Sequence, residues 1–484
     1  MTSTTATDLA YLSAGEALAA FRRLECSPLD MLEAQISEID ARNGDTTTGI
    51  NAFTETMFDT ARSAARHAAD QYARCATDGE APPALLGLTV ATKEKHGIAG
   101  RRLEYGLEAK RGQLADHDHP VVQRILAAGG IIHGRTTSPE FSCATVTHSP
   151  MWGVTRNPWN PQTSPGGSSG GAGAALAAGF TTLATASDIA GSTRIPAGFT
   201  GVVGYKAPFG RVPGLPPLAA DWYRGDGPMG RTVADVALLA AVMSGRHPVD
   251  HDSWGPNGRP IDVGGGIAGL RIVLSVRLGD YPVAPEIVAN TRVVADALAA
   301  AGAEVVEVDL PWTTELIRET SFAHFGHILG PAVAREIAGT EDRVSAYLRR
   351  IIADAGAAAQ RYSLVDSLAM DARMRGDLAA AMDGADVLLC PTSAVTSLSA
   401  DGDYLDGIDT PERHLTHYWE SHMTVPFNVA NACPVLSVPS GMSDDGVPTG
   451  VQVVGHPNDE EMVFRVAQAI ESVPGRLPAY PGRN

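Results

Sequence analysis

The segment Gly166-Gly167-Ser168-Ser169-Gly170-Gly171 leads directly into the alanine-rich run of residues 172–178. This order predicts a tight, hydroxyl-rich turn at the start of a helix, where backbone N–H groups lack partners within the helix. The segment contains G-x-S-x-G, but a nucleophile elbow must follow a strand, and the preceding RNPWNP is not typical of one. The dinucleotide-binding pattern G-x-G-x-x-G also fails, because Leu176 stands where glycine or alanine is needed. A purely structural glycine turn stays open as the plain alternative.

A second segment, SDIAGSTRIP at residues 187–196, follows the apolar run of residues 181–186. It therefore predicts a loop at the end of a strand, with Ser192 in the loop and successive backbone N–H groups that can cradle an anion. The chain has only four lysines, and one of them, Lys93, ends the apolar run of residues 88–91. Burial there would favour loss of the lysine proton.

Together these segments resemble the amidase signature family of serine hydrolases, whose catalytic unit is a Ser-Ser-Lys triad with a cis peptide at the middle serine. The run GGSSGG is the family signature, and Ser168 and Ser192 lie 24 positions apart, as the family's middle serine and nucleophile do. The resemblance also covers the N-terminal helices, the strand that carries Lys93, and residues 120–141, 204–208, 386–392 and 426–470.

The resemblance implies a mechanism for cleaving an amide, which is a poor electrophile with a poor leaving group. Ser192 would attack the carbonyl, and Ser168 would pass the proton to a neutral Lys93 and later return it to the departing amine. The resemblance assigns the oxyanion hole to the backbone N–H groups of Ile189, Ala190, Gly191 and Ser192. Ala190 stands where many members have glycine, and the cyclic-dimer hydrolases share that alanine, which is weak guidance to the substrate.

Other polar residues around these segments are interpreted as supporting groups. Asp188 and Arg194 bracket the nucleophile, and an ion pair that holds the turn is favoured over direct substrate contact. Ser169 is a candidate supporting hydroxyl, with ordinary turn satisfaction as the alternative. Lys95 is expected to be a solvated lysine just past the strand end, and Lys206 a structural one.

The fourteen histidines include two pairs spaced three apart, His324 with His327 and His414 with His417. No acidic ligand completes an obvious metal set, so these residues are expected at the surface or at a pocket rim, and no metal or cofactor is expected. By analogy with the family, the same segments help to line the substrate pocket, with the candidates Trp222, Tyr223, Phe325, Tyr418 and Trp419.

The order of apolar runs favours one α/β domain over residues 1–484. Residues 8–76 carry helical spacing and predict a helical N-terminal layer, and residues 85–210 form the predicted catalytic core around the signature segment 166–196. Residues 267–484 would supply the remaining α/β core and the pocket segments, with a hairpin at 435–454 and a last helix at 460–472. Residues 255–266 are the one plausible subdomain seam. The resemblance implies the amidase signature fold, a mixed β-sheet core covered by helices.

Composition limits the partners that we expect. With 44% hydrophobic and 19% charged residues the 484-residue chain is globular, and its net charge of −18 has the wrong sign for binding nucleic acid or an anionic membrane. The start MTSTTATDLA has neither a basic nor an apolar leader region, and the five scattered cysteines form no C-x-x-C pair. We therefore expect a cytoplasmic protein with a small-molecule amide substrate. A homodimer is an expectation from the family alone.

The main functional hypothesis is an amidase that works through an acyl-Ser192 intermediate. One alternative is an amide-forming acyltransferase, because an amine can intercept the acyl-enzyme. Another is the A-type subunit of a tRNA-dependent amidotransferase, against which the net charge of −18 and the lack of a basic cluster weigh. A catalytically silent binding protein is disfavoured because Lys93, Ser168 and Ser192 are all present.

Overall fold

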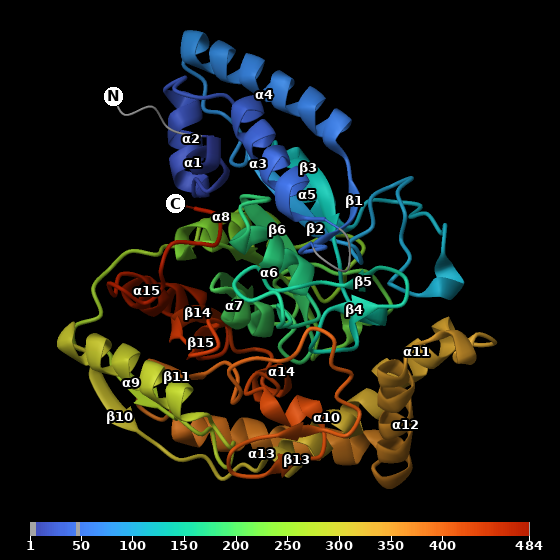
Figure 1. Cartoon of the computed structure of the whole chain (residues 1–484). Helices are drawn as coiled ribbons and strands as arrows, with labels where there is room; N and C mark the ends of the chain where they lie inside the picture. Colours follow the sequence, from blue (N-terminus) through green and yellow to red (C-terminus); the bar gives the residue numbers. More distant parts are fainter. Residues whose placement is uncertain (1–5, 45–48, 484) are drawn as a thin grey trace.

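The computed structural model describes residues 6–44 and 49–483, and it is built around one long β-sheet (Figure 1). In the described residues this sheet has 11 strands. Their spatial order is β1 (Phe53–Thr56), β3 (Ile131–Thr136), β2 (Thr89–Lys93), β6 (Leu183–Asp188), β8 (Gly225–Gly230), β7 (Val203–Lys206), β14 (Val435–Met442), β15 (Pro448–Gly455), β11 (Val387–Pro391), β9 (Arg271–Leu274) and β10 (Glu304–Glu307).

The sheet is mixed, which confirms the predicted fold class. Strands β3, β2 and β6 pair in parallel, and so do β11, β9 and β10, while the pairs between these two groups are antiparallel. The carboxyl ends of parallel strands meet at one edge of a sheet, so the ends of β2 and β6 lie side by side. Two further pairs stand apart from the sheet: β4 (His148–Ser149) with β5 (Gly153–Val154), and β12 (Ile408–Asp409) with β13 (His414–Leu415).

Helices cover both faces of the sheet, as the alternation along β11 shows. Val387 and Leu389 pack in one hydrophobic cluster, and Leu388 and Cys390 pack in another on the opposite face. The helices are α1 (Ala6–Ala10), α2 (Ala14–Arg22), α3 (Pro28–Arg42), α4 (Phe58–Asp78), α5 (Pro120–Ala127), α6 (Gly170–Ala177), α7 (Arg194–Thr200), α8 (Val233–Met243), α9 (Pro285–Ala300), α10 (Thr314–His327), α11 (Leu329–Glu336), α12 (Ala346–Arg361), α13 (Leu364–Ala381), α14 (Pro426–Val429) and α15 (Glu460–Glu471).

The helix expected after the signature segment is α6, and every residue in it is buried. Its alanines and glycines leave room for close packing against β6 and α7. At Gly170, an added Cβ would lie 2.3 Å from the Thr147 hydroxyl, so a larger residue would push the helix away from its neighbour. Small side chains therefore place the start of α6 beside the ends of β2 and β6.

The N-terminal layer is mainly helical, with one difference from the prediction. Ser27 caps α3 and forms a capping box with Asp30, as the Ser-Pro start signal indicates. However, β1 interrupts the predicted layer and pairs antiparallel with β3, because Phe53 can pack beside His133 at that sheet edge. Residues 45–48 of the predicted layer, like residues 1–5 and 484 of the predicted domain, lie outside the described residues.

The later half of the chain continues the same sheet. Residues 255–266 run between α8 and β9, and β9 pairs with β11 inside the 11-stranded sheet. The predicted hairpin is present as β14 and β15, and helices α10 to α13 lie at the opposite end of the molecule from α1 to α4 (Figure 1). Within the described part of the chain, no helix has the length and apolar character needed to cross a membrane.

Candidate functional site

Lys93 is the last residue of β2, and its side chain is fully buried. Its Nζ atom lies 2.7 Å from Ser168 Oγ, 2.9 Å from Ser169 Oγ and 3.1 Å from Ser187 Oγ. The two serines of the signature approach from the start of α6, and Ser187 approaches from the end of β6. The structure therefore surrounds this amine with three hydroxyl groups and, among the described residues, no carboxylate within hydrogen-bonding distance.

The surroundings of Lys93 lower its pKa well below the ordinary lysine value. Burial is the largest cause, because the charged form loses its hydration, and the positive charge of nearby Lys95 adds to the effect. Asp226 and Asp188 act in the opposite direction without reversing it. The neutral amine is the form that could accept a proton from a hydroxyl.

The signature segment makes a tight turn before α6. The peptide bond between Gly167 and Ser168 is cis, and Ser169 is the N-cap residue of the helix. A Cβ on Gly167 would come within 2.6 Å of the Val146 carbonyl oxygen, so only glycine fits there. The glycines are thus required by close packing, and they hold Ser168 and Ser169 against the Lys93 amine.

The loop after β6 is held by a buried ion pair. Arg194 donates to both oxygens of Asp188 at 3.0 and 2.9 Å, and both side chains are almost fully buried. Asp188 also accepts the N–H groups of Gly191 at 2.7 Å and Thr193 at 3.2 Å. Burial tends to raise the pKa of Asp188, but the Arg194 guanidinium overrides it and lowers the value to about 2. The structure thus shows the predicted ion pair, which clamps the turn on both sides of Ser192.

Ser192 lies in this turn with 8% of its surface exposed. Its hydroxyl has no hydrogen-bond partner among the described residues, and it faces a narrow cavity that Ser168 and Ser187 also line. The turn depends on Gly191, which has φ +116° and whose Cβ, if present, would lie 2.0 Å from Thr424 Oγ1. Ser168 and Ser192 therefore line one cavity, and the Lys93 amine lies behind its wall in contact with Ser168.

The predicted set of four backbone donors needs one correction. The Gly191 N–H group is engaged by the Asp188 carboxylate. Within the described chain, the N–H groups of Ile189, Ala190 and Ser192 have no acceptor. The Asp188 carboxylate that holds the turn therefore occupies the Gly191 N–H group. Three of the four predicted donors remain free to bind an oxygen atom.

Most of the predicted pocket aromatics lie in the core, which corrects that expectation. Trp419 lines the cavity beside Ser192, but Trp222 lines a different apolar cavity near α13, and its indole N–H donates to Asp371. The rings of Tyr223 and Phe325 pack against each other and against His324 and do not line the cavity beside Ser192. Tyr418 does not line it either, because its ring packs against His417 and Trp419.

Two of the four histidines expected at the surface are buried. His324 stacks on Tyr223 at a ring separation of 3.7 Å and lies 2.7 Å from Asp221, and His417 packs against Phe322. Helical spacing alone does not say which face of a helix packs inside, which is why this expectation was wrong.

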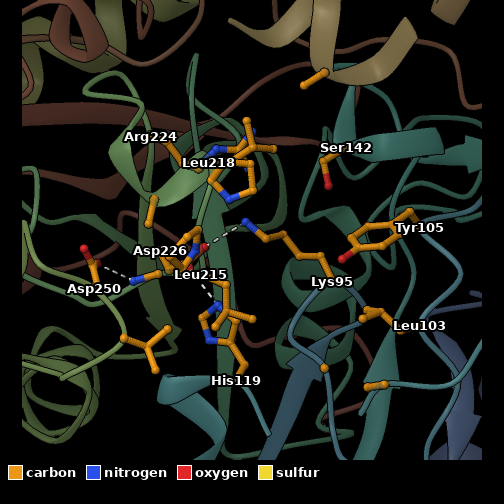
Figure 2. Close-up of a pocket in the computed structure, with 18 of the residues that line it drawn as sticks. Lys95, Leu103, Tyr105, His119, Ser142, Leu215, Leu218, Arg224, Asp226 and Asp250 are labelled. Carbon is orange, nitrogen blue, oxygen red and sulfur yellow. Dashed lines mark hydrogen bonds and ion pairs between the residues drawn. The ribbon is translucent and has the colours of Figure 1, made fainter. Parts of the chain in front are cut away.

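Lys95 is also not the solvated lysine that the sequence predicted. The strand ends at Lys93, and the following turn directs Lys95 to Asp226 on β8, at a distance of 3.0 Å (Figure 2). Only 12% of the Lys95 side chain is exposed. Lys206 is buried, as a structural lysine should be, and burial lowers its pKa to about 7 while its amine contacts Asn431.

His96, His119 and Asp226 form the one cluster in the described residues with spacing suited to a metal ion, with potential ligand atoms within 4.8 Å of one another. The opposite ring nitrogens decide against that use. Val121 N–H donates to His119 Nδ1, and the Thr185 hydroxyl, which already accepts the Lys93 N–H, lies 2.8 Å from His96 Nδ1. A neutral imidazole that accepts at Nδ1 carries its proton on Nε2.

Burial lowers the pKa of both histidines, which favours neutral rings. The His119 Nε2 atom, 3.6 Å from Asp226, then carries a proton and not a lone pair. The His96 Nε2 atom lies 3.1 Å from the same carboxylate without a hydrogen bond, and the Lys95 ammonium group contacts it at 3.0 Å. These donors do not fit a metal ion. The two imidazoles and the Lys95 ammonium group surround one buried carboxylate, and Lys95 donates a hydrogen bond to it.

Sequence reasoning missed Ser187, Asp226 and Arg224. Asp226 pairs with Ser187 in the antiparallel register of β8 and β6, and Arg224 directly precedes β8. Arg224 lines the narrow cavity beside Ser192 and also a second cavity of about 500 Å³. The two cavities are therefore neighbours that share part of their wall, and the long-range pairing of β8 brings Asp226 and Arg224 to them.

Similarity to known proteins extends over nearly the whole chain. A protein-family model described as Amidase matches residues 33–464. A 6-aminohexanoate-cyclic-dimer hydrolase of Pseudomonas sp. (strain NK87) is 34% identical over 482 residues, covering 94% of this chain and 92% of the relative. A glutamyl-tRNA(Gln) amidotransferase subunit of Synechococcus sp. (strain CC9605) is 33% identical over 456 residues, covering 87% and 89%. The crystal structure of a bacterial aryl acylamidase of the amidase signature family matches with a TM-score of 0.84 at 26% identity, covering 95% and 96%.

Proposed function

Because this chain belongs to the amidase signature family, we propose that it is an amidase that hydrolyses a carboxamide C–N bond through an acyl-Ser192 intermediate. The observation that carries the proposal is the fully buried Lys93 amine 2.7 Å from Ser168 Oγ, together with the cavity that Ser168 and Ser192 both line. A lysine without a carboxylate partner, in contact with hydroxyls only, suits proton acceptance and has little purpose as a structural cation.

In the first half of the proposed reaction, Ser192 Oγ bonds to the amide carbon. Its proton moves to Ser168 Oγ, and the Ser168 proton moves to Lys93 Nζ. The carbonyl oxygen gains negative charge, and the free N–H groups of Ile189, Ala190 and Ser192 would stabilise it. Removal of a single oxyanion donor typically costs about 10²–10³ in rate.

In the second half, the C–N bond breaks and the relay reverses. Ser168 donates its proton to the departing nitrogen and takes one from the Lys93 ammonium, which leaves a neutral amine on the lysine. Water then attacks the Ser192 ester, gives up a proton through the same relay, and releases a carboxylic acid as Ser192 recovers its hydroxyl. Ser168 and Lys93 therefore act together as the base when Ser192 or water attacks and as the acid when the amine or Ser192 departs.

The relay requires one small motion. Although the hydroxyls of Ser168 and Ser192 line the same cavity, no hydrogen bond joins these two residues in the described part of the chain. Catalytic hydrogen bonds often tighten only in the complex with substrate. Rotation of the Ser192 side chain, which no hydrogen bond among the described residues opposes, would bring its proton to Ser168.

A screen of amides and esters with the purified protein tests the proposal, with intact-mass measurement of the acyl adduct. We expect an adduct and turnover with wild-type protein and neither with Ser192→Ala. A matched control is Ser244→Ala, because the Ser244 hydroxyl is also buried and has no partner among the described residues, yet it lies after α8 and lines no cavity at the site. Equal adduct formation by wild type and Ser192→Ala would overturn the proposal.

The same assay separates hydrolysis from acyl transfer. If candidate amines are added and the free acid disappears in favour of a new amide, the acyl-enzyme transfers its acyl group. The similarity to an amidotransferase component makes ammonia release from glutamine a necessary member of the panel. We expect the free acid to remain the main product.

A further inference from the structure

The cavity of about 500 Å³ shares three lining residues with the cavity beside Ser192, namely Phe141, Ser142 and Arg224. A substrate whose amide carbonyl lies at Ser192 would therefore extend past these residues into the larger space. Leu103, Leu215 and other apolar side chains of its wall suit an aliphatic or aryl body (Figure 2). The polar groups of the same wall then decide what the far end of the substrate carries.

Nearly all of the charged groups that line this cavity already have partners. Lys95 pairs with Asp226 at 3.0 Å, and Lys110 pairs with Glu336 at 2.5 Å. The Glu336 carboxylate also lies 3.9 Å from the guanidinium of the exposed Arg335. Two further carboxylates are Asp250, which accepts the Gly214 N–H at 2.8 Å, and Asp116, which is exposed at the rim.

Arg224 is the one lysine or arginine of this wall without a partner among the described residues. Its guanidinium group has no hydrogen bond, ion pair or ring contact among the residues that the structure describes, and its Nε atom is shielded from solvent without an acceptor. Its backbone, by contrast, is fixed: the N–H donates to Asp221 O at 2.9 Å, and the carbonyl accepts from Asn431 at 3.3 Å. A guanidinium on a fixed backbone, in the shared wall of two cavities and with unused donors, is suited to an anionic ligand.

We propose that Arg224 binds a carboxylate carried by the amide substrate, so that this enzyme selects amides that bear a free carboxylate at a distance from the scissile bond. The planar guanidinium offers parallel N–H donors that match the two oxygens of a carboxylate. This inference rests on the proposed function for the reaction itself, but it makes a separate statement about substrate class. Figure 2 shows Arg224 across the pocket from Tyr105, where an apolar spacer would lie between them.

Matched pairs of amides test the proposal. In each pair the terminal carboxylate of one compound is replaced by a neutral carboxamide in the other, with the carboxylate placed on the acyl side in one series and on the amine side in another. Binding is measured by calorimetry with Ser192→Ala, which needs no turnover. We expect the carboxylate compound of one series to bind about 10–100-fold more tightly than its neutral partner, as a charge-assisted hydrogen-bond pair would give.

Arg224→Gln in the same background should weaken binding of the carboxylate compound more than binding of its neutral partner, so that the preference is lost. Arg224→Lys should restore part of it, because the charge remains and the parallel donors do not. Arg335→Gln is the matched control: that guanidinium lines the same cavity but is 69% exposed, so the preference should persist. In turnover by the enzyme with Ser192 intact, Arg224→Gln should lower kcat/KM for the carboxylate amide alone.

Equal binding of charged and neutral partners in both series would overturn the inference, even before any Arg224 variant is made. Equal loss of affinity for both partners in Arg224→Gln would also overturn it, since that result indicates a structural role. The proposed function fails in a different way: no amide would be cleaved, or Ser192→Ala would cleave as wild type does. Amides that turn over without a carboxylate preference leave the function standing and remove only the inference.

Discussion

Asp188→Asn tests the idea that a buried ion pair holds the loop that carries Ser192. Asp188 accepts two hydrogen bonds from Arg194, two from the N–H groups of Gly191 and Thr193, and one from Asn428. The amide of asparagine can replace neither the charge nor both acceptor oxygens, so Arg194 would stay buried without a counter-ion. Loss of one partner of a buried pair typically costs about 3–5 kcal/mol of unfolding free energy.

The carboxylate also predicts how stability depends on pH. The pKa of Asp188 in the folded protein is about 2, whereas an unfolded aspartate titrates near 4, and this difference corresponds to about 2.5 kcal/mol. Because the folded value is the lower one, this contribution is fully present above about pH 4 and is lost as the pH falls toward 2. Asp188→Asn should lack this part of the acid sensitivity.

Denaturant unfolding at pH 7 and at pH 3 measures both effects. The double variant Asp188→Asn/Arg194→Met should be less destabilised than the sum of the single variants, because it removes the uncompensated charge. The exposed pair of Arg259 and Glu461 offers a control, since Glu461→Gln should cost at most about 1 kcal/mol. A cost below about 1 kcal/mol for Asp188→Asn, with additive single effects, would refute this reasoning.

Three further predictions concern catalysis. Lys93→Ala should slow acylation of Ser192 by about 10²–10⁴ in single-turnover mass measurements, because the general base is lost; an unchanged rate would assign the proton to another group. The wild-type kcat/KM should rise with pH and level off well below the ordinary lysine pKa, since only the neutral Lys93 accepts a proton; a rate that falls over this range in a pH–rate profile would contradict the assignment. Gly191→Ala should remove most activity, because its Cβ would lie 2.0 Å from Thr424 Oγ1 and the residue has φ +116°; turnover and melting temperature within error of wild type would show that the turn tolerates a side chain.

Local sequence signals predicted the elements that carry the serines and the lysine. The apolar run before Lys93 is β2, the run before Ser192 is β6, and the glycine-rich turn opens α6. Each of these is a short-range property: alternation and burial define a strand, and small residues at a helix start define the turn. The convergence of Lys93 with Ser168 was available only through the family resemblance, since spacing along a chain does not fix distances in space.

What the sequence did not predict depends on pairing between distant segments. Asp226 reaches the site because β8 pairs with β6, and the same pairing explains why Lys95 is buried and paired instead of solvated. Tyr223 and Phe325 are as apolar as pocket residues would be, but mutual ring packing places them in the core. Aromatic residue types occur both in pockets and in cores, so the residue type alone does not show where such a side chain lies.

The two lysines at the end of β2 show how neighbours decide chemistry. Lys93 and Lys95 are both almost fully shielded from water, yet Lys93 meets only hydroxyl groups, whereas Lys95 meets the Asp226 carboxylate. A carboxylate partner favours the ammonium form, and hydroxyl partners do so far less. The paired charge on Lys95 in turn disfavours a second charge on Lys93. Because of the turn after β2, the two lysines have different partners: Lys95 supports the site, and Lys93 can accept a proton. An exchange of partners would exchange these roles.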